Sequence, residues 1–105
     1  MNRMTVEEFS ERLQSLNDLT LVDVRETWEF EIGHLPGSKN IPLHTLPTFL
    51  ETADKEKPYL FICHHGIRSA RATAYADSQG FVDAWNLSGG VAAWSQRVDP
   101  SFPTY

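Results

Sequence analysis

Short apolar runs alternate with segments of helical spacing along most of the chain. The apolar runs predict strands over residues 19–24, 38–41, 59–63 and 81–87. Between them, spacing and caps predict helices over residues 5–16, 43–52 (from Leu43 or Thr45), 67–79 and 91–96, with a helical turn near 28–31. This alternation, with no hairpin signal, favours an α/β fold. We therefore expect a mainly parallel central sheet of about five short strands, with helices on both faces.

Two of these helices carry more specific expectations. Thr5 followed by Glu8 is a capping-box pattern, in which the hydroxyl and the carboxylate each bind a free amide of the first turn. In the helix over 67–79, we expect the small residues Ala70 and Ala74, together with Ile67, to face the sheet. This would let the helix lie close to the strands.

The length and composition of the chain fit one globular domain. The 105 residues include 41% hydrophobic and 22% charged residues, as in an ordinary domain of this size. We see no repeat or linker, so residues 1–105 are expected to form a single domain. The stretch over 97–105 contains two prolines and is expected to be an extended C-terminal tail.

Charge and hydropathy exclude several classes of function. The net charge of −5 argues against a nucleic-acid-binding surface, which needs clustered lysine and arginine. No apolar run approaches the ~20 residues of a membrane-spanning helix, and the first ten residues lack the apolar core of a secretory signal. We expect a soluble, cytoplasmic protein, although a chain stripped of a targeting segment would look the same. Nothing marks an interface, so a monomer is expected.

The single cysteine, Cys63, ends the apolar run at 59–63 and precedes the segment "HHGIRS". A residue there would lie at the carboxyl edge of the sheet, where active sites of open α/β sheets occur. Gly66 permits a positive φ, so that successive amides and the positive end of the next helix would face the thiol. That environment favours the nucleophilic thiolate.

Cations gather around this cysteine in the sequence, namely His64, His65, Arg68 and Arg71. No acidic residue is nearer along the chain than Glu56 and Asp77. This pattern suggests a small anionic substrate. The alternative is that these are solvated surface charges, and for Arg71 alone that alternative is favoured. A metal site is not expected, because Cys63 and the two histidines are adjacent, whereas zinc ligands are usually spaced by two to four residues. No cofactor is indicated.

Four motifs, in order, carry a resemblance to a known family. They are "LVDVRE" (Leu21–Glu26), "FEIGHLPGSKNIP" (Phe30–Pro42), "CHHGIRS" (Cys63–Ser69) and "NLSGGVAAW" (Asn86–Trp94). Together they resemble the rhodanese family of sulfurtransferases over nearly the whole chain. The resemblance implies a thiosulfate sulfurtransferase that forms a persulfide on Cys63.

The resemblance also implies roles for individual residues. Cys63 would be the nucleophile and sulfur carrier, and the substrate-binding residues would be those of the following loop: His64, His65, Gly66, Ile67, Arg68 and Ser69. The donor would be a small sulfur-containing anion such as thiosulfate, and the acceptor a thiol, cyanide or a sulfur-carrier protein. Asp23 and Arg25 would form a buried structural ion pair. Structural roles are likewise expected for Glu29, Glu31, His34, Gly89, Gly90 and Trp94.

Three other interpretations compete with a thiosulfate sulfurtransferase. Phosphatases and arsenate reductases of related fold use a cysteine, five residues and then an arginine, whereas Ser69 stands at that position here. A non-catalytic rhodanese-like binding module remains an alternative, although such modules usually lack the cysteine. The ending "AAWSQRVDPSFPTY" is similar to rhodanese domains attached to E1-like enzymes, so the persulfide could feed a biosynthetic sulfur relay.

Overall fold

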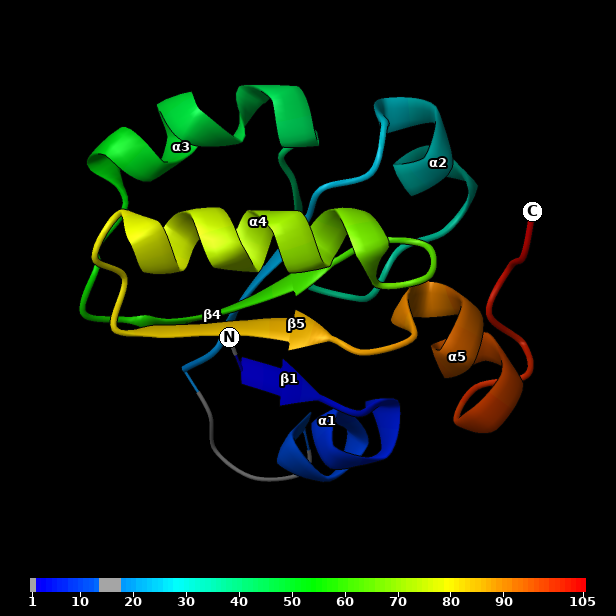
Figure 1. Ribbon diagram of the computed structural model, residues 1–105. Coiled ribbons are helices and arrows are strands. Elements are labelled where there is room, and N and C mark those ends of the chain that lie inside the picture. Colours follow the sequence, from blue (N-terminus) through cyan, green and yellow to red (C-terminus); the bar gives the residue numbers. More distant parts are fainter. Residues whose placement is uncertain (1, 14–17) are drawn as a thin grey trace.

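Five parallel strands form a single sheet in the computed structural model, which describes residues 2–13 and 18–105 (Figure 1). The order across the sheet is β1-β5-β4-β2-β3. The strands are β1 (Asn2–Met4), β2 (Thr20–Asp23), β3 (Lys39–Asn40), β4 (Pro58–Ile62) and β5 (Asp83–Leu87). β4 is central, because it pairs with β5 on one side and β2 on the other.

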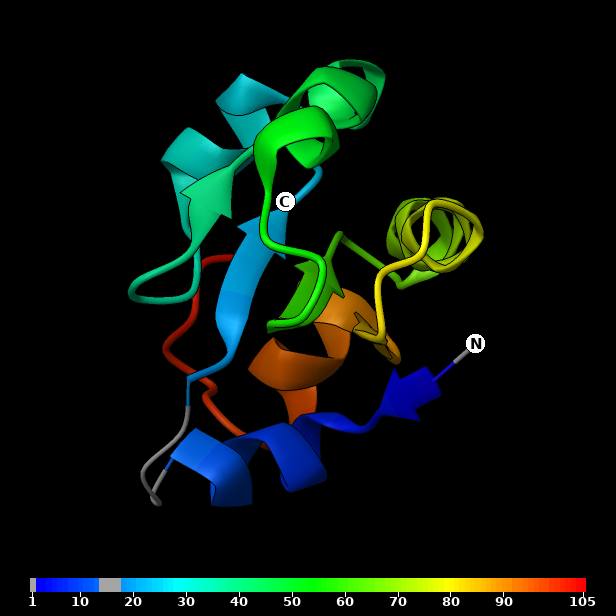
Figure 2. The same cartoon turned by 90° about the vertical axis from the view of Figure 1, so that its left-hand side faces the viewer.

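Helices cover both faces of the sheet, as predicted (Figures 1 and 2). The helices are α1 (Val6–Leu13), α2 (Thr27–Ile32), α3 (Leu46–Thr52), α4 (Ile67–Ser78) and α5 (Gly90–Arg97), with a 3-10 turn at Leu43–Thr45. α1 and α5 lie on one face, and α3 and α4 lie on the other.

The central strand supplies both hydrophobic cores, because side chains alternate between the faces of a strand. Leu60 and Ile62 point into the core beneath α1 and α5. Tyr59 and Phe61 point into the core beneath α3 and α4. Every residue of β4 is buried, which explains why its sequence reads as one continuous apolar run.

The predicted elements agree with the structure to within a few residues at their ends. The exception is β1, which was not predicted because it has three residues, two of them polar and exposed, at the edge of the sheet. The capping box is confirmed: the Thr5 amide donates to Glu8 Oε1 at 2.8 Å, and the Glu8 amide donates to Thr5 Oγ1 at 3.1 Å. The predicted end of this helix, over residues 14–16, falls outside the described residues.

The prediction of which α4 residues face the sheet was wrong. Ile67 is 69% exposed and Ala74 is also exposed, whereas the residues that face the sheet are Ser69, Ala72, Thr73 and Ala76. The error arises because Ser69 and Thr73 are polar, so they were not counted toward the apolar face. Thr73 satisfies its hydroxyl by donating to Ser69 O at 2.7 Å.

The chain after α5 folds back onto the protein rather than running loosely over it. Phe102 is only 8% exposed and belongs to the core beneath α1 and α5. Its carbonyl accepts a hydrogen bond from Ser95 Oγ at 3.2 Å, and Pro103 packs against Gly33. As a result, Tyr105 is brought to the carboxyl edge of the sheet.

Candidate active site

Cys63 is the first residue beyond β4, at the carboxyl edge of the sheet and at its centre. The residue is only 1% exposed. The chain then turns sharply at Gly66, which has a φ of +94°, and enters α4 at Ile67. A β-carbon at Gly66 would also come within 3.0 Å of Gly89 N, so both conformation and space favour glycine.

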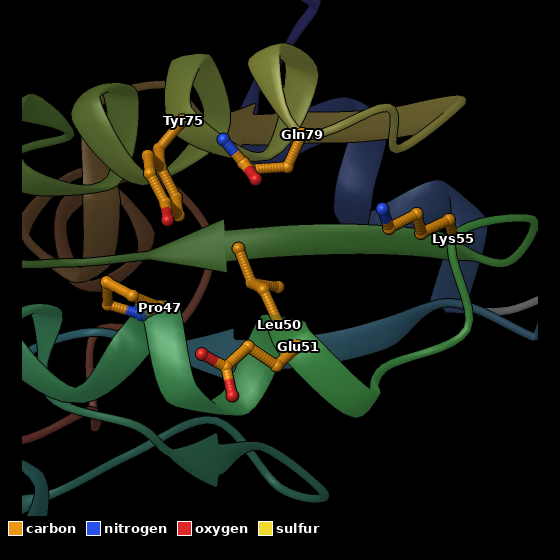
Figure 3. A pocket seen from close by; sticks show the side chains of 6 residues that line it. All are labelled: Pro47, Leu50, Glu51, Lys55, Tyr75 and Gln79. Carbon is orange, nitrogen blue, oxygen red and sulfur yellow. The ribbon is translucent and has the colours of Figure 1, made fainter.

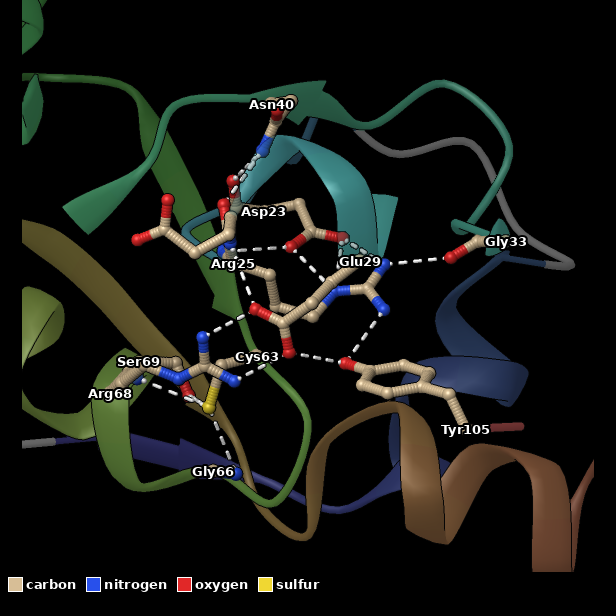
Figure 4. A network of polar contacts seen from close by, with 11 residues as sticks. Asp23, Arg25, Glu29, Gly33, Asn40, Cys63, Gly66, Arg68, Ser69 and Tyr105 are labelled. Carbon is tan, nitrogen blue, oxygen red and sulfur yellow. Dashed lines mark hydrogen bonds and ion pairs between the residues drawn. The ribbon is translucent and has the colours of Figure 1, made fainter. Parts of the chain in front are cut away.

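Three groups contact the Cys63 sulfur from the start of α4 (Figure 4). The Gly66 amide donates to Sγ at 3.1 Å, and the Ser69 amide donates at 3.4 Å. The Ser69 hydroxyl lies 3.3 Å from the same sulfur. Two backbone donors at the positive end of a helix favour an anionic sulfur over a neutral one.

Asn86 on β5 holds this loop from below. Its Nδ2 donates to Gly66 O at 3.1 Å, so its Oδ1 is left to accept the Ser69 hydroxyl at 2.5 Å. With that proton committed to Asn86, a protonated Cys63 would donate its S–H to Ser69 Oγ. In the thiolate state, the sulfur and Asn86 compete for the Ser69 proton.

The start of α5 supports the loop from a third direction. The amides of Val91 and Ala92 donate to the carbonyls of Cys63 and His64, each at 3.0 Å. Gly90 lies so close beneath them that a β-carbon would meet Cys63 O at 2.3 Å and His64 O at 2.4 Å. The "SGG" motif therefore provides room for the cysteine loop as well as turn geometry.

The expected buried pair of Asp23 and Arg25 is confirmed. Both side chains have an exposure of 0%, and Arg25 donates from Nε and Nη2 to the carboxylate at 2.7–3.1 Å. Burial is the largest single effect and lowers the pKa of Arg25, but the hydrogen bonds and Coulombic attraction of Asp23 and Tyr105 together outweigh it, so the net direction is upward. Arg25 also donates to Gly33 O at 2.8 Å and to the Tyr105 hydroxyl at 3.2 Å.

A second ion pair joins Arg68 to Glu29 on α2 (Figure 4). Arg68 donates from both terminal nitrogens to the two carboxylate oxygens, at 2.6 and 2.9 Å. The hydrogen bonds from Arg68 lower the pKa of Glu29 from 4.5 to about 2, although burial opposes the change. The same hydrogen bonds raise the pKa of Arg68 above its ordinary value. Both groups are therefore charged at neutral pH.

Aromatic rings form a row above the loop. Trp28 meets Tyr105 edge-on at 5.7 Å, Tyr105 packs on His64 at 4.3 Å, and His64 stacks on His65 at 4.1 Å between ring centroids. Burial, reinforced by the neighbouring His65, lowers the pKa of His64, so its ring is neutral at pH 7. Trp28 and His65 are exposed, so this row faces solvent.

The structure thus places the sequence-predicted site residues in different positions. Gly66 and Ser69 contact the Cys63 sulfur, and Arg68 pairs with Glu29. Ile67 points to solvent.

Sequence reasoning assigned Glu29 only a structural role and gave Asn86 and Tyr105 no role at all. Asn86 directly precedes the "LSGG" turn in the fourth motif, and that position beside the loop was the available signal. For Tyr105 the sequence offered no signal.

A shallow cleft between α3 and α4 lies away from this site (Figure 3). Its lining includes Tyr75 and Gln79 near the end of α4, whereas Cys63 precedes the first turn of that helix. Within residues 2–13 and 18–105, no three His, Cys, Asp or Glu side chains converge as metal ligands would. No helix in the same ranges is long and apolar enough to cross a membrane.

Fold and site together define an α/β protein with a buried cysteine bound by loop amides at the head of a helix. Comparison with known proteins identifies its relatives. Residues 5–97 match the family model described as Rhodanese-like domain. The chain belongs to the rhodanese-like domain family, so the resemblance seen in the four motifs is confirmed.

Individual relatives give the same result. The chain is 38% identical to the thiosulfate sulfurtransferase GlpE of Pseudomonas aeruginosa, over 74% of this chain and 71% of GlpE. It is 38% identical, over 99% of its own length, to the adenylyltransferase and sulfurtransferase MOCS3 of Arabidopsis thaliana. The crystal structure of a rhodanese-like domain protein from Staphylococcus aureus superposes with a TM-score of 0.86 and 32% identity, covering 100% of this chain and 99% of that one.

Some relatives are much longer than this chain. It spans 26% of MOCS3. It also spans 36% of the chloroplastic Rhodanese-like/PpiC domain-containing protein 12 of Arabidopsis thaliana, to which it is 38% identical over 95% of its own length. Most of each of these two relatives therefore lies outside the match.

Proposed function

We propose that this chain is a sulfurtransferase that carries sulfane sulfur as a persulfide on Cys63, from a small donor such as thiosulfate to a thiophilic acceptor. The observation that carries the proposal is the position of the Cys63 sulfur. It lies at the carboxyl edge of the central strand, beneath two amide donors and one hydroxyl. The GlpE relative, named a thiosulfate sulfurtransferase, supports the same reaction class.

The first half-reaction is a displacement at sulfur. The Cys63 thiolate attacks the outer sulfur of thiosulfate, and a new S–S bond forms while the bond to the sulfite sulfur breaks. The electron pair of the broken bond leaves with sulfite, so charge and electrons balance and no redox partner is needed. In the second half-reaction an acceptor nucleophile attacks the outer persulfide sulfur, and the Cys63 thiolate returns.

The residues around Cys63 would contribute by holding negative charge. The amides of Gly66 and Ser69 already point to Sγ, and preorganised donors of this kind stabilise an anion without reorganising during the reaction. The same donors would stabilise the sulfur as leaving group when the acceptor attacks. The remaining loop residues, His64, His65, Ile67 and Arg68, would surround the incoming donor.

Steady-state assay with thiosulfate and cyanide tests this proposal, with thiocyanate formation as the readout. We expect activity in the wild-type chain and none in Cys63→Ser, with both proteins folded by circular dichroism. A folded wild-type chain with a free thiol and no turnover, with thiosulfate or any other sulfane donor, would favour the binding-module alternative.

A second candidate is a relay in which the acceptor is a sulfur-carrier protein. The MOCS3 relative favours it, because it is named both adenylyltransferase and sulfurtransferase and the match covers 99% of this chain. The test is transfer of labelled sulfur from persulfurated protein to a sulfur carrier and its adenylating enzyme. Transfer would support the relay, whereas neither binding nor transfer would count against it.

A further inference from the structure

Arg68 belongs to the cationic pocket that the sequence suggested around Cys63, but neither it nor the nearby Arg25 is an unpaired cation. Arg25 is paired with Asp23, and Arg68 is paired with Glu29 (Figure 4). These two ion pairs contribute no net charge. The lowered pKa of His64 leaves its ring neutral at pH 7. The charge of Arg68 is therefore offset just where a donor anion would approach.

Glu29 is held firmly in this position. Its Oε1 accepts the Glu26 amide at 2.9 Å, as part of the capping box of α2, and its Oε2 accepts the Tyr105 hydroxyl at 2.7 Å. With the two bonds from Arg68, each carboxylate oxygen has two donors. The Glu29 side chain is only 5% exposed, against 34% for Arg68. A carboxylate bound in this way is a built feature of the site rather than a chance surface contact.

The two members of this pair therefore have unequal freedom. Glu29 is fixed from three sides, while Arg68 is partly exposed and reaches Glu29 across 39 positions of sequence. Any anion attracted by Arg68 also meets the field of Glu29. The unfavourable Coulomb energy from Glu29 is proportional to the charge of the donor.

We infer that Glu29 is a specificity-determining residue of the sulfur-donor site, which disfavours doubly charged donors such as thiosulfate relative to donors with one negative charge. This inference rests on the proposed sulfurtransferase function. Methanethiosulfonate is a suitable singly charged probe: the thiolate takes its terminal sulfur, and methanesulfinate leaves with the electron pair, just as sulfite leaves from thiosulfate. The two donors therefore share one reaction and differ in charge.

The test is the second-order rate constant for Cys63 persulfide formation, followed by intact mass, with each donor in wild type, Glu29→Gln, Arg68→Gln and the double variant. We expect Glu29→Gln to accelerate the reaction with thiosulfate about tenfold and with methanethiosulfonate about threefold, since the logarithm of the gain scales with donor charge. For the same reason, Arg68→Gln should slow the reaction with thiosulfate about tenfold and the reaction with methanethiosulfonate about threefold. The gains and losses should shrink as ionic strength rises.

The double variant distinguishes charge from direct contact. If the pair acts through its summed charge, the ratio of the two rate constants in the double variant returns close to the wild-type ratio. The inference would be overturned if Glu29→Gln left the ratio of the thiosulfate and methanethiosulfonate rate constants unchanged. It would also be overturned if that ratio were the same in the double variant as in Arg68→Gln. Each comparison uses the ratio of two rate constants measured in the same protein, so a partial loss of folded protein lowers both rate constants equally and leaves the ratio unchanged. If Glu29→Gln does not fold, Arg68→Gln still tests the charge dependence. Absence of persulfide in the wild type with both donors would instead overturn the proposed function, and the inference with it.

Discussion

The Ser69 hydroxyl on α4 donates a buried hydrogen bond to Asn86 Oδ1 on β5, at 2.5 Å, and the same hydroxyl lies 3.3 Å from the Cys63 sulfur. Asn86 Nδ2 donates to Gly66 O, so this one side chain holds both Gly66 and Ser69, the two residues whose amides donate to the sulfur. The geometry of the thiol site thus depends on a residue that does not touch the sulfur in this structure. Its removal should affect reactivity as well as stability.

We expect Asn86→Ala to lower the free energy of unfolding by about 1–3 kcal/mol, because Gly66 O and the Ser69 hydroxyl lose a buried partner. We also expect persulfide formation to slow about tenfold, since loosely held amides stabilise the anion less well. Asn40→Ala is a matched control, because the Asn40 side chain also makes two hydrogen bonds, from Nδ2 to the carbonyls of Asp23 and Arg25, but does not bind the cysteine loop. Equal slowing in the two variants would contradict a specific role for Asn86.

Gly90→Ala should disrupt the cysteine loop. A β-carbon there would overlap Cys63 O at 2.3 Å, so either the loop or the start of α5 must move. We expect a loss of roughly 3 kcal/mol or more and very low sulfur transfer. Gly37→Ala controls for backbone strain alone, because Gly37 also has a positive φ of +82° but has no atom within 4 Å of an added β-carbon. It should cost about 1–2 kcal/mol and leave the transfer rate unchanged.

Acid should weaken the protein through Glu29. Because the folded-state pKa of about 2 lies below the ordinary value of 4.5, the stabilisation is present above about pH 4.5 and is lost as the pH falls toward 2. Urea unfolding across this range should show wild type more stable than Glu29→Gln by about 1–2 kcal/mol at pH 7, with the difference shrinking on acidification. A difference that stays constant from pH 7 to pH 2 would be inconsistent with an ionised Glu29–Arg68 pair.

The segment after α5 should contribute to stability through Phe102. We expect Phe102→Ala to cost about 3 kcal/mol in urea unfolding, because it empties a buried site in the core beneath α1 and α5. The exposed neighbour Thr104 provides the comparison, and Thr104→Ala should change stability by less than about 0.5 kcal/mol. Similar small effects in the two variants would show that Phe102 packs only loosely.

The fold was largely predictable because its signals are local. The apolar run of β4 and the spacing of α1 reflect burial that repeats along a few residues. β1 was missed because backbone pairing with β5 holds it in the sheet, while its own sequence has no apolar run. The inner face of α4 was wrong because hydrogen bonding, rather than hydropathy, decides that Ser69 and Thr73 are buried.

The site was predictable only in part, because some of its contacts are local in the sequence and others join distant segments. Cys63, Gly66 and Ser69 lie within seven residues of sequence. Their contact therefore follows from a strand that ends just before a helix begins. The Glu29–Arg68 pair spans 39 positions and the Tyr105–Glu29 contact spans 76. Such contacts depend on how α2 and the segment after α5 pack, which no local pattern encodes. The charge of Arg68 is offset by a carboxylate from a distant helix, which nearness along the sequence did not reveal.

The measurement that tests the central claim most directly is the intact mass of the protein after treatment with thiosulfate, beside Cys63→Ser. We predict that the wild type gains one sulfur atom and loses it on addition of cyanide, while Cys63→Ser stays folded and gains nothing. A wild-type chain that is folded, has a free Cys63 thiol and gains no sulfur from thiosulfate or methanethiosulfonate would contradict the account. Sulfur gained equally by the Cys63→Ser variant would contradict it as well.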